Sequence, residues 1–215
     1  MADGCVYKGS SKNSYRLQIN LSEQDACILD NFNNAIGSDY PIIHKTIYNK
    51  KTNKEYKIVS IKINNTEMCT DLMKLGVVPR KSLIAEMPNI NKSLVRHFIR
   101  GYFDGDGNIS YTVNGYISLS WNIVGGETIL TAFCKILNSE DISCSIYKIN
   151  HSNAVSLETG SKESIMKIFK YLYCNSNIFL ARKYNLFLII KNMICPSKQR
   201  CLDKNQANCG ENLIA

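Results

Sequence analysis

Two aspartates in one short segment are the side chains of this sequence best suited to metal chemistry. The segment 94–110 carries apolar residues at helical spacing and then continues Asp104-Gly105-Asp106-Gly107. We expect a helix that stops at this turn, with both carboxylates at its C-terminal end. Because that end of a helix disfavours negative charge, two acids there predict that a cation binds beside them.

A plain surface turn or a calcium loop could contain the same four residues. An EF-hand loop that starts at Asp104 needs glycine at its sixth position and glutamate at its twelfth, where this sequence has Ile109 and Gly115. The EF-hand alternative is therefore excluded, whereas a surface turn stays open at this point.

Periodic segments on both sides of the turn predict the elements that must position it. Strands with one apolar and one polar face are predicted over 15–21 and 116–123, a hairpin over 40–64, and a strand pair over 143–159. Helices are predicted over 22–34, 65–75, 127–138 and 162–173, and from 179 to about 193. The pattern predicts an α+β protein with antiparallel sheets.

The polar faces of these strands and two hairpin turns carry the candidate nucleic-acid contacts. Outward polar side chains of this kind read base edges in the major groove, and lysines at a turn reach flanking phosphates. An ordinary solvated strand face has a similar pattern, so that alternative stays open. The predicted contact residues are Arg16, Gln18, Asn20, Lys50, Lys51, Lys54, Lys62, Ser118, Ser120, Asn122, Lys148 and Asn150.

Composition restricts the class of protein. A net charge of +8 favours a polyanionic partner, although many basic proteins bind no nucleic acid. The sequence has no apolar run of about 18 residues and no signal-peptide pattern, so we expect no membrane span and no secretion. Nine scattered cysteines are expected to be reduced, in a cytoplasmic or organellar compartment.

An internal repeat organises the chain. Equivalent residues recur at separations of 103, 102 and 101 positions, for the pairs Asp3 and Asp106, Lys81 and Lys183, and Tyr15 and Tyr116. This offset predicts a duplicated αββαββα unit, with repeats over 1–90 and 91–193 and a polar tail over 194–215. Met1-Ala2-Asp3-Gly4 matches only the end of the central segment, so the first copy of the central helix is expected to be largely missing.

The run Ile99-Arg100-Gly101-Tyr102-Phe103-Asp104-Gly105-Asp106-Gly107 resembles the signature of the LAGLIDADG homing endonucleases. The preceding Phe98 and the following Asn108-Ile109-Ser110 also fit that family, whereas Arg100 departs from it, because the family often has a small residue there. The resemblance covers residues 1 to about 193. It implies a single-chain, two-repeat fold in which two antiparallel sheets form a DNA-binding saddle and two central helices pack through their glycines.

The resemblance also implies a metal site. Asp106 and Asp3 would bind divalent metal beside Gly105 and Ala2, as Mg²⁺ with Mn²⁺ as a substitute, and each aspartate would serve one DNA strand. Lys183 and Lys81 stand at equivalent points after short helices. A lysine in this place would orient water or stabilise the transition state, and a lysine that simply flanks a helix is the alternative for each.

The leading interpretation is a monomeric homing endonuclease that cleaves both strands of a DNA site of roughly 20 bp, as in intron homing. The alternatives are an RNA-binding intron maturase, a non-cleaving DNA-binding protein of the same fold, and a nicking enzyme, since Asp106 alone stands in an intact motif. Without a first central helix, the apolar face that carries Leu94, Ile99 and Tyr102 is expected to be exposed.

Overall fold

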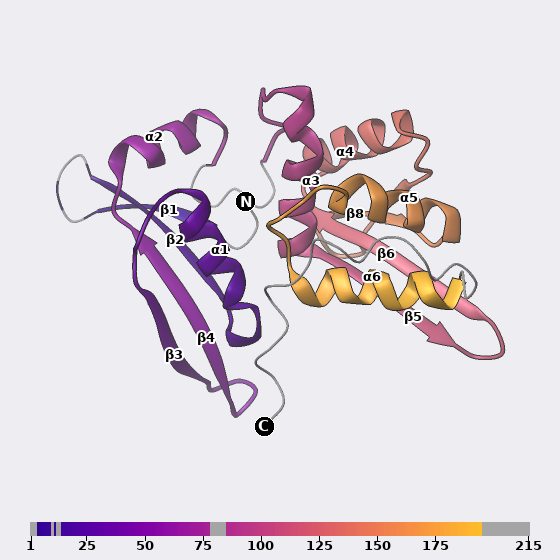
Figure 1. Cartoon of the computed structure of the whole chain (residues 1–215), viewed down its shortest axis with the longest axis horizontal. Coiled ribbons are helices and arrows are strands. Elements are labelled where there is room, and N and C mark those ends of the chain that lie inside the picture. The colour runs from indigo at the N-terminus through magenta and orange to yellow at the C-terminus, as the bar shows by residue number, and fades with distance from the viewer. Residues whose placement is uncertain (1–3, 10, 12–13, 78–84, 195–215) are drawn as a thin grey trace.

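Two four-stranded antiparallel sheets with the same strand order form the frame of the chain. The computed structural model describes residues 4–9, 11, 14–77 and 85–194 (Figure 1). One sheet has the order β1-β2-β4-β3 and the other the order β5-β6-β8-β7. The predicted α+β architecture with two antiparallel sheets is confirmed.

The N-terminal half alternates strands with short helices. Its elements are β1 (Gly4–Lys8), β2 (Tyr15–Ser22), η1 (Glu23–Asp25), α1 (Cys27–Ala35), β3 (Ile42–Asn49), β4 (Lys54–Ile63) and α2 (Thr66–Lys74). Period-two alternation positions the strands: Leu17 is fully buried, while its neighbours Arg16 and Gln18 face the other side of the sheet. Asn65 begins α2 because its side chain accepts a hydrogen bond from the Met68 N–H.

The C-terminal half begins with the longest helix of the described chain. Its elements are α3 (Lys92–Asp106), β5 (Gly107–Val113), β6 (Ile117–Gly125), α4 (Glu127–Ser139), β7 (Ser145–Lys148), β8 (Val155–Thr159), α5 (Lys162–Tyr173) and α6 (Ala181–Ile194). Asn91 and Ser161 begin α3 and α5 as side-chain caps, since each accepts a backbone N–H of the first turn.

Strand register relates the two sheets residue by residue. Gly4 of β1 pairs with Ile19 of β2, and Gly107 of β5 pairs with Ile123 of β6. The sequence prediction did not identify β1 and β5, although the alternation of Asn108, Ser110 and Thr112 with apolar residues is a strand signal. This register later fixes which side chains occupy equivalent positions in the two halves.

Each half has its own hydrophobic core. The C-terminal core is the larger and is rich in aromatic rings, with Phe133 edge-on to Phe98 at 5.9 Å and to Tyr102 at 5.3 Å between centroids. The N-terminal core is smaller and mostly aliphatic, around Leu17, Val59 and Ile61. The expected exposure of Ile99 and Tyr102 is wrong, because both are buried in the C-terminal core, whereas Leu94 is 52% exposed.

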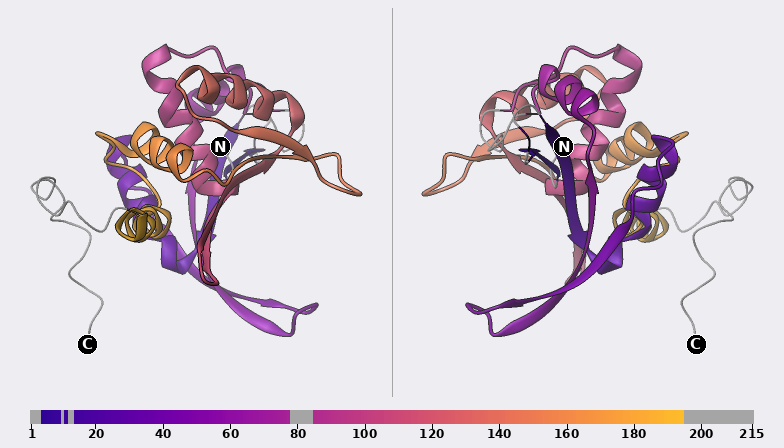
Figure 2. Two further views of the ribbon diagram at one scale, coloured as in Figure 1. Left: turned by 90° about the vertical axis from the view of Figure 1, so that its right-hand side faces the viewer. Right: turned by 90° about the vertical axis from the view of Figure 1, so that its left-hand side faces the viewer.

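The helices lie on one side of the two sheets and leave a concave side uncovered (Figure 2). This arrangement follows from alternation, since only one face of each sheet carries the apolar residues that a helix can cover. Among the described residues, no helix is long and apolar enough to cross a membrane.

An ion pair joins the halves. The Nε of Arg182, in the first turn of α6, lies 3.1 Å from one carboxylate oxygen of Asp25 and 3.2 Å from the other. Asp25 is 6% exposed, so its carboxylate is largely screened from water. The pair therefore helps to fix the C-terminal helix against η1 of the other half.

Phe133→Ala should destabilise the C-terminal half by about 3–5 kcal/mol, because it leaves a cavity among packed aromatic rings. Urea unfolding followed by the fluorescence of Trp121, the single tryptophan of the chain and fully buried in the same core, measures the loss. Tyr116→Ala is the matched control, since Tyr116 is 74% exposed. That control should change stability by no more than about 0.5 kcal/mol. Equal effects of both substitutions would contradict this packing.

Candidate active site and nucleic-acid interface

The two aspartates of the central motif lie in different environments. Helix α3 does not stop before the motif but continues through Asp104-Gly105-Asp106, and Gly107 begins β5. Asp106 is exposed at the junction between the helix and the strand. Asp104 is 7% exposed and faces the interior. The motif therefore presents one carboxylate outward and holds the other inside.

Asp104 is held by hydrogen bonds from α5 and from the segment that follows it. Its carboxylate accepts the Tyr173 hydroxyl at 2.9 Å and the Leu180 N–H at 3.1 Å. Burial raises the pKa of the Asp104 carboxyl, and these two hydrogen bonds, with Lys183 and Arg100, offset only part of that increase. Burial and the nearby Asp104 also raise the pKa of the Tyr173 hydroxyl. The expectation that both aspartates face a bound cation is wrong for Asp104.

Lys183 provides a cation at the C-terminal end of α3. The residue is 4% exposed, and its ammonium donates to the carbonyl oxygens of Phe103 at 2.6 Å, Asp104 at 2.8 Å and Gly107. It also lies 4.7 Å from the centre of the Phe103 ring. The Phe103 carbonyl also accepts the Gly107 N–H, and the carbonyls at the end of a helix carry the negative end of its dipole. The ammonium therefore stabilises the last turn of α3. The predicted catalytic role of Lys183 stays a prediction.

Arg100 points away from the exposed glycine of α3 and binds the turn after α5. Its Nε donates to the Ile178 carbonyl at 3.0 Å, and its Nη1 donates to the Leu172 carbonyl at 3.0 Å and to the Ser176 hydroxyl at 2.6 Å. The same Nη1 lies 2.6 Å from Nδ1 of His97, and burial together with this guanidinium lowers the pKa of His97. A neutral His97 can accept that hydrogen bond.

A polar ridge on α3, which consists of Arg96, Arg100 and Asp104, anchors the helix to this segment. The three residues recur every four positions and so share one face of the helix. Arg96 completes the ridge by donating to the Cys174 carbonyl at 2.6 Å. The unexpected arginine of the motif is thus accommodated on the side of α3 that faces α5.

A third face of α3, the one that carries Gly101, is open in the described structure. Gly101 is exposed, and a Cβ placed on it would meet no heavy atom within 4 Å in the described structure. Leu94, two turns earlier on the same face, is also exposed. Arg100 therefore does not obstruct close packing against the glycine face of α3.

The residues around Asp106 fit a hard divalent cation. Among the described residues, no group of three or more histidine, cysteine, aspartate or glutamate side chains could hold a metal ion. Mg²⁺ does not need such a group, because it keeps several waters and takes one or two carboxylates beside phosphate oxygens. Asp106, with the adjacent Gly105 carbonyl, could supply the protein part of that shell.

Three predicted site residues, Asp3, Ala2 and Lys81, lie outside the described residues. The residue after Asp3 is nevertheless placed, since Gly4 begins β1 in the same register as Gly107 begins β5. The pairing of Asp3 with Asp106 as metal ligands stays a prediction.

The predicted contacts on the strands lie on the uncovered side of the sheets. Arg16, Gln18 and Asn20 alternate with core residues of β2, and Lys62 pairs with Gln18 across β4. Arg16 Nε and the Ser60 hydroxyl are buried on this face without a hydrogen-bond partner in the described structure. Such groups are suited to a ligand that supplies the missing partner. Ser118, Ser120 and Asn122 occupy the same side of β6, and Lys54 begins β4 on it.

The remaining predicted contacts lie at hairpin ends. Lys50 and Lys51 form the turn between β3 and β4, and Asn150 lies in the turn after β7. Lys148 ends β7 opposite the buried Val155, so its strand position belongs to the helix-covered side of the sheet. Periodicity missed Lys45, Asn108 and Glu158 on the uncovered side, although Asn108 adjoins the buried Ile109 and Glu158 adjoins the buried Leu157. The DNA contacts of all these residues stay predictions.

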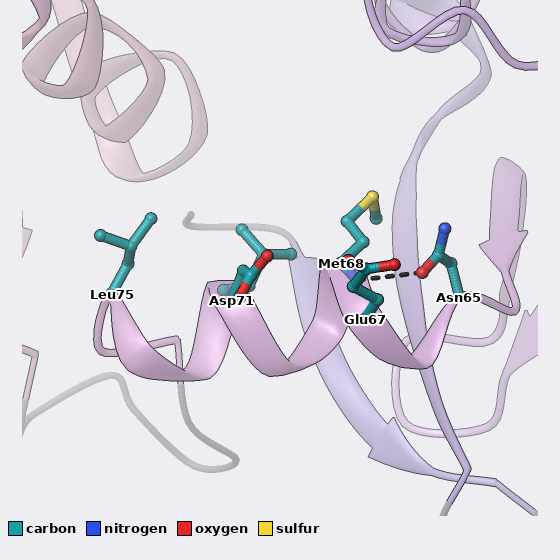
Figure 3. Close-up of a pocket in the computed structure, with 6 residues that line it drawn as sticks. Asn65, Glu67, Met68, Asp71 and Leu75 are labelled. Atoms are coloured by element: carbon teal, nitrogen blue, oxygen red, sulfur yellow. Dashed lines mark hydrogen bonds between the residues drawn. The ribbon is translucent and has the colours of Figure 1, made fainter.

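A surface hollow lies along α2, and residues between Asn65 and Leu75 line it (Figure 3). Its lining includes the Asn65 cap, Met68 and the carboxylates of Glu67 and Asp71. Lys74 already pairs with Asp71 at 2.8 Å. The hollow has no connection to the central motif, and we assign it no function.

Comparison with known proteins supports the fold. No protein-family model and no curated protein matches the sequence. The I-SmaMI LAGLIDADG homing endonuclease bound to cleaved DNA aligns with 89% of this chain and 85% of its own, at 14% identity and a TM-score of 0.58. I-GzeII in complex with its DNA target aligns over 91% and 88%, at 15% identity and a TM-score of 0.60. I-LtrWI bound to target DNA aligns over 90% and 87%, at 12% identity and a TM-score of 0.59.

These likenesses confirm the fold that the residues 99–107 predicted. The chain has the architecture of the LAGLIDADG homing endonucleases, with the central motif at the end of α3 and two uncovered sheets beside it.

Lys183→Met should lower the free energy of unfolding by about 2 kcal/mol or more, because it leaves several buried carbonyls without a donor. Urea unfolding measures the change, and Lys170→Met on the exposed side of α5 is the control. A lysine that acts only on water or on the transition state would leave stability unchanged. An unaltered urea midpoint for Lys183→Met would therefore contradict the helix-end role.

The free energy of unfolding of the unaltered protein, measured against that of the Asp104→Asn variant, should fall as pH rises. Because the pKa of Asp104 is raised in the folded state, the folded protein keeps a proton that an aspartate in the unfolded chain loses at about pH 3.9. The stabilisation by the protonated carboxyl is complete below that pH and is lost as pH rises through the higher folded pKa. Urea midpoints of both proteins across this range measure the difference. Asp141→Asn is the control, and a difference that grows with pH would refute the assignment.

Proposed function

We propose that this chain is a site-specific DNA endonuclease that hydrolyses phosphodiester bonds with a divalent metal. The observation that carries the proposal is the exposed carboxylate of Asp106, the last residue of α3, directly before β5 of an uncovered sheet. A carboxylate in this position can meet a phosphate only if a cation lies between them.

The DNA part of the proposal is supported by fold and charge. The solved structures with this fold include I-SmaMI bound to cleaved DNA and I-GzeII in complex with its DNA target. The chain carries a net charge of +8, and its polar strand faces lie on the side that the helices leave open. Duplex DNA fits such a surface, because lysine and arginine neutralise phosphates and release counterions.

Each residue of the site has a separate task in this proposal. Asp106 and the Gly105 carbonyl hold the cation, and Asp3 with Ala2 does so in the other half. When bound, Mg²⁺ or Mn²⁺ lowers the pKa of a coordinated water and stabilises charge on the leaving oxygen. Lys183 keeps the last turn of α3 in place, and Asp104 fixes the same turn from inside. One aspartate per strand makes a double-strand break the expected product.

The proposed protein acts as a monomer on a site of roughly 20 bp, two half-sites of about one helical turn each, in the manner of intron homing. No disulfide joins the described cysteines, which suits a cytoplasmic or organellar compartment. The second candidate is an RNA-binding maturase or a non-cleaving DNA-binding protein. The same uncovered sheets would serve it, but it would not need the exposed carboxylate of Asp106.

Cleavage selection tests the proposal. The protein is incubated in Mg²⁺ with a pool of duplexes that carry roughly 20 randomised base pairs, and the cut ends are sequenced. We expect a recurring cut site, and we expect Asp106→Asn to reduce cleavage by about 100-fold or more, because the substitution removes a metal-binding charge. Asp141→Asn makes the same chemical change at an exposed residue far along the chain and should cleave normally.

Other outcomes separate the alternatives. Tight, salt-sensitive binding without any cutting would favour the maturase or the non-cleaving DNA-binding protein. Conversion of supercoiled plasmid to open circles with little linear product would indicate a nicking enzyme with one competent half. Equal cleavage by Asp106→Asn would overturn the assigned metal site.

A further inference from the structure

Equivalent rows of side chains cross the uncovered faces of the two sheets close to the central motif. In the C-terminal sheet, Asn108 pairs with Asn122, Asn122 with Glu158, and Glu158 with Ser145. In the N-terminal sheet, Cys5 pairs with Gln18 and Gln18 with Lys62. Directly paired residues of antiparallel strands point to the same side, so each row lies on one face.

The register makes Lys62 and Glu158 equivalent. The row that contains Lys62 starts at Cys5, one position after Gly4 begins β1. The row that contains Glu158 starts at Asn108, one position after Gly107 begins β5. On β4 and β8 the two rows carry a cation in one half, Lys62, and a carboxylate in the other, Glu158. The repeat thus conserves the backbone position and reverses the charge.

At a second pair of equivalent positions, the N-terminal sheet again carries the more positive side chain. Arg16 pairs with Tyr7 in the N-terminal sheet, where Ser120 pairs with Ser110 in the other. The Arg16 guanidinium carbon lies 6.0 Å from the centre of the Tyr7 ring, which steadies the side chain over the strand.

The difference extends over both faces. The uncovered face of the N-terminal sheet carries the basic residues Arg16, Lys45, Lys54 and Lys62. Within the described strands of the C-terminal sheet, the corresponding face carries serine, threonine and asparagine with Val124 and Tyr147. Its charged residue is Glu158, and it has no lysine or arginine.

We infer that the two sheets recognise their DNA half-sites by different chemistry, with Lys62 and Glu158 reading opposite bases at symmetry-related positions. This inference rests on the proposed function. A lysine donates to the O6 and N7 atoms of guanine, whereas a glutamate accepts the N4 amino group of cytosine. The bound site therefore has guanine under Lys62 and cytosine under Glu158. Phosphate attraction is concentrated in the half that β4 contacts.

Selection for binding, rather than for cleavage, tests the inference. A pool of duplexes with roughly 20 randomised base pairs is separated by gel retardation, and the retained sequences are read for four proteins. These are the unaltered chain, Glu158→Lys, Lys62→Glu and the control Glu55→Lys. Glu55 lies on the other face of β4, opposite Tyr48, so its substitution changes the net charge as Glu158→Lys does without touching the reading face.

We expect Glu158→Lys to change the preferred base at a single position from cytosine to guanine, and Lys62→Glu to make the reverse change in the other half. Each altered protein should prefer its new site over the original by about tenfold or more. Glu55→Lys should keep the original site.

The outcomes separate this inference from the proposed function. A site that neither substitution alters would overturn the inference and leave sequence-specific binding in place. A chain that retains duplexes without any sequence preference would overturn the proposed function as well.

Discussion

The C-terminal end of α3 depends on one buried ammonium group. A helix end carries unpaired carbonyls and partial negative charge, and here it also carries two aspartates. Lys183 of α6 donates to the carbonyls of Phe103, Asp104 and Gly107, so it closes the last turn and the start of β5 together. The central motif can therefore end a helix, begin a strand and keep a carboxylate outward without an exposed, frayed terminus.

The polar ridge of α3 then gives the two aspartates of the motif different functions. Arg96, Arg100 and Asp104 bind the segment between α5 and α6, which leaves the glycine face of the helix open. The Asp104 carboxylate accepts hydrogen bonds from Tyr173 and Leu180, whereas Asp106 stays exposed beside the uncovered sheets. The proposed metal-binding function falls to the outer carboxylate, because a buried, hydrogen-bonded one cannot reach a phosphate.

The two repeats share one backbone architecture, and they differ in the side chains on which the proposed DNA recognition depends. The two sheets share strand order and register, yet their uncovered faces differ in charge, most sharply at Lys62 and Glu158. A surface of this kind can keep the pseudo-symmetric shape that suits a duplex while it treats the two half-sites differently. The Arg182–Asp25 ion pair links α6 of the C-terminal half to η1 of the N-terminal half.

The sequence by itself determined most of the elements and their faces, although β1 and β5 were not predicted. Alternation placed Leu17 inward and Arg16 outward, the repeat offset predicted two similar halves, and the motif at 99–107 predicted the fold. Local patterns suffice for these features because they depend on neighbours along the chain. The tertiary structure alone decided that Asp104 is buried, that Lys183 caps α3, and that Lys62 and Glu158 are equivalent. Those features depend on contacts between residues tens of positions apart, and no local periodicity encodes the packing that brings them together.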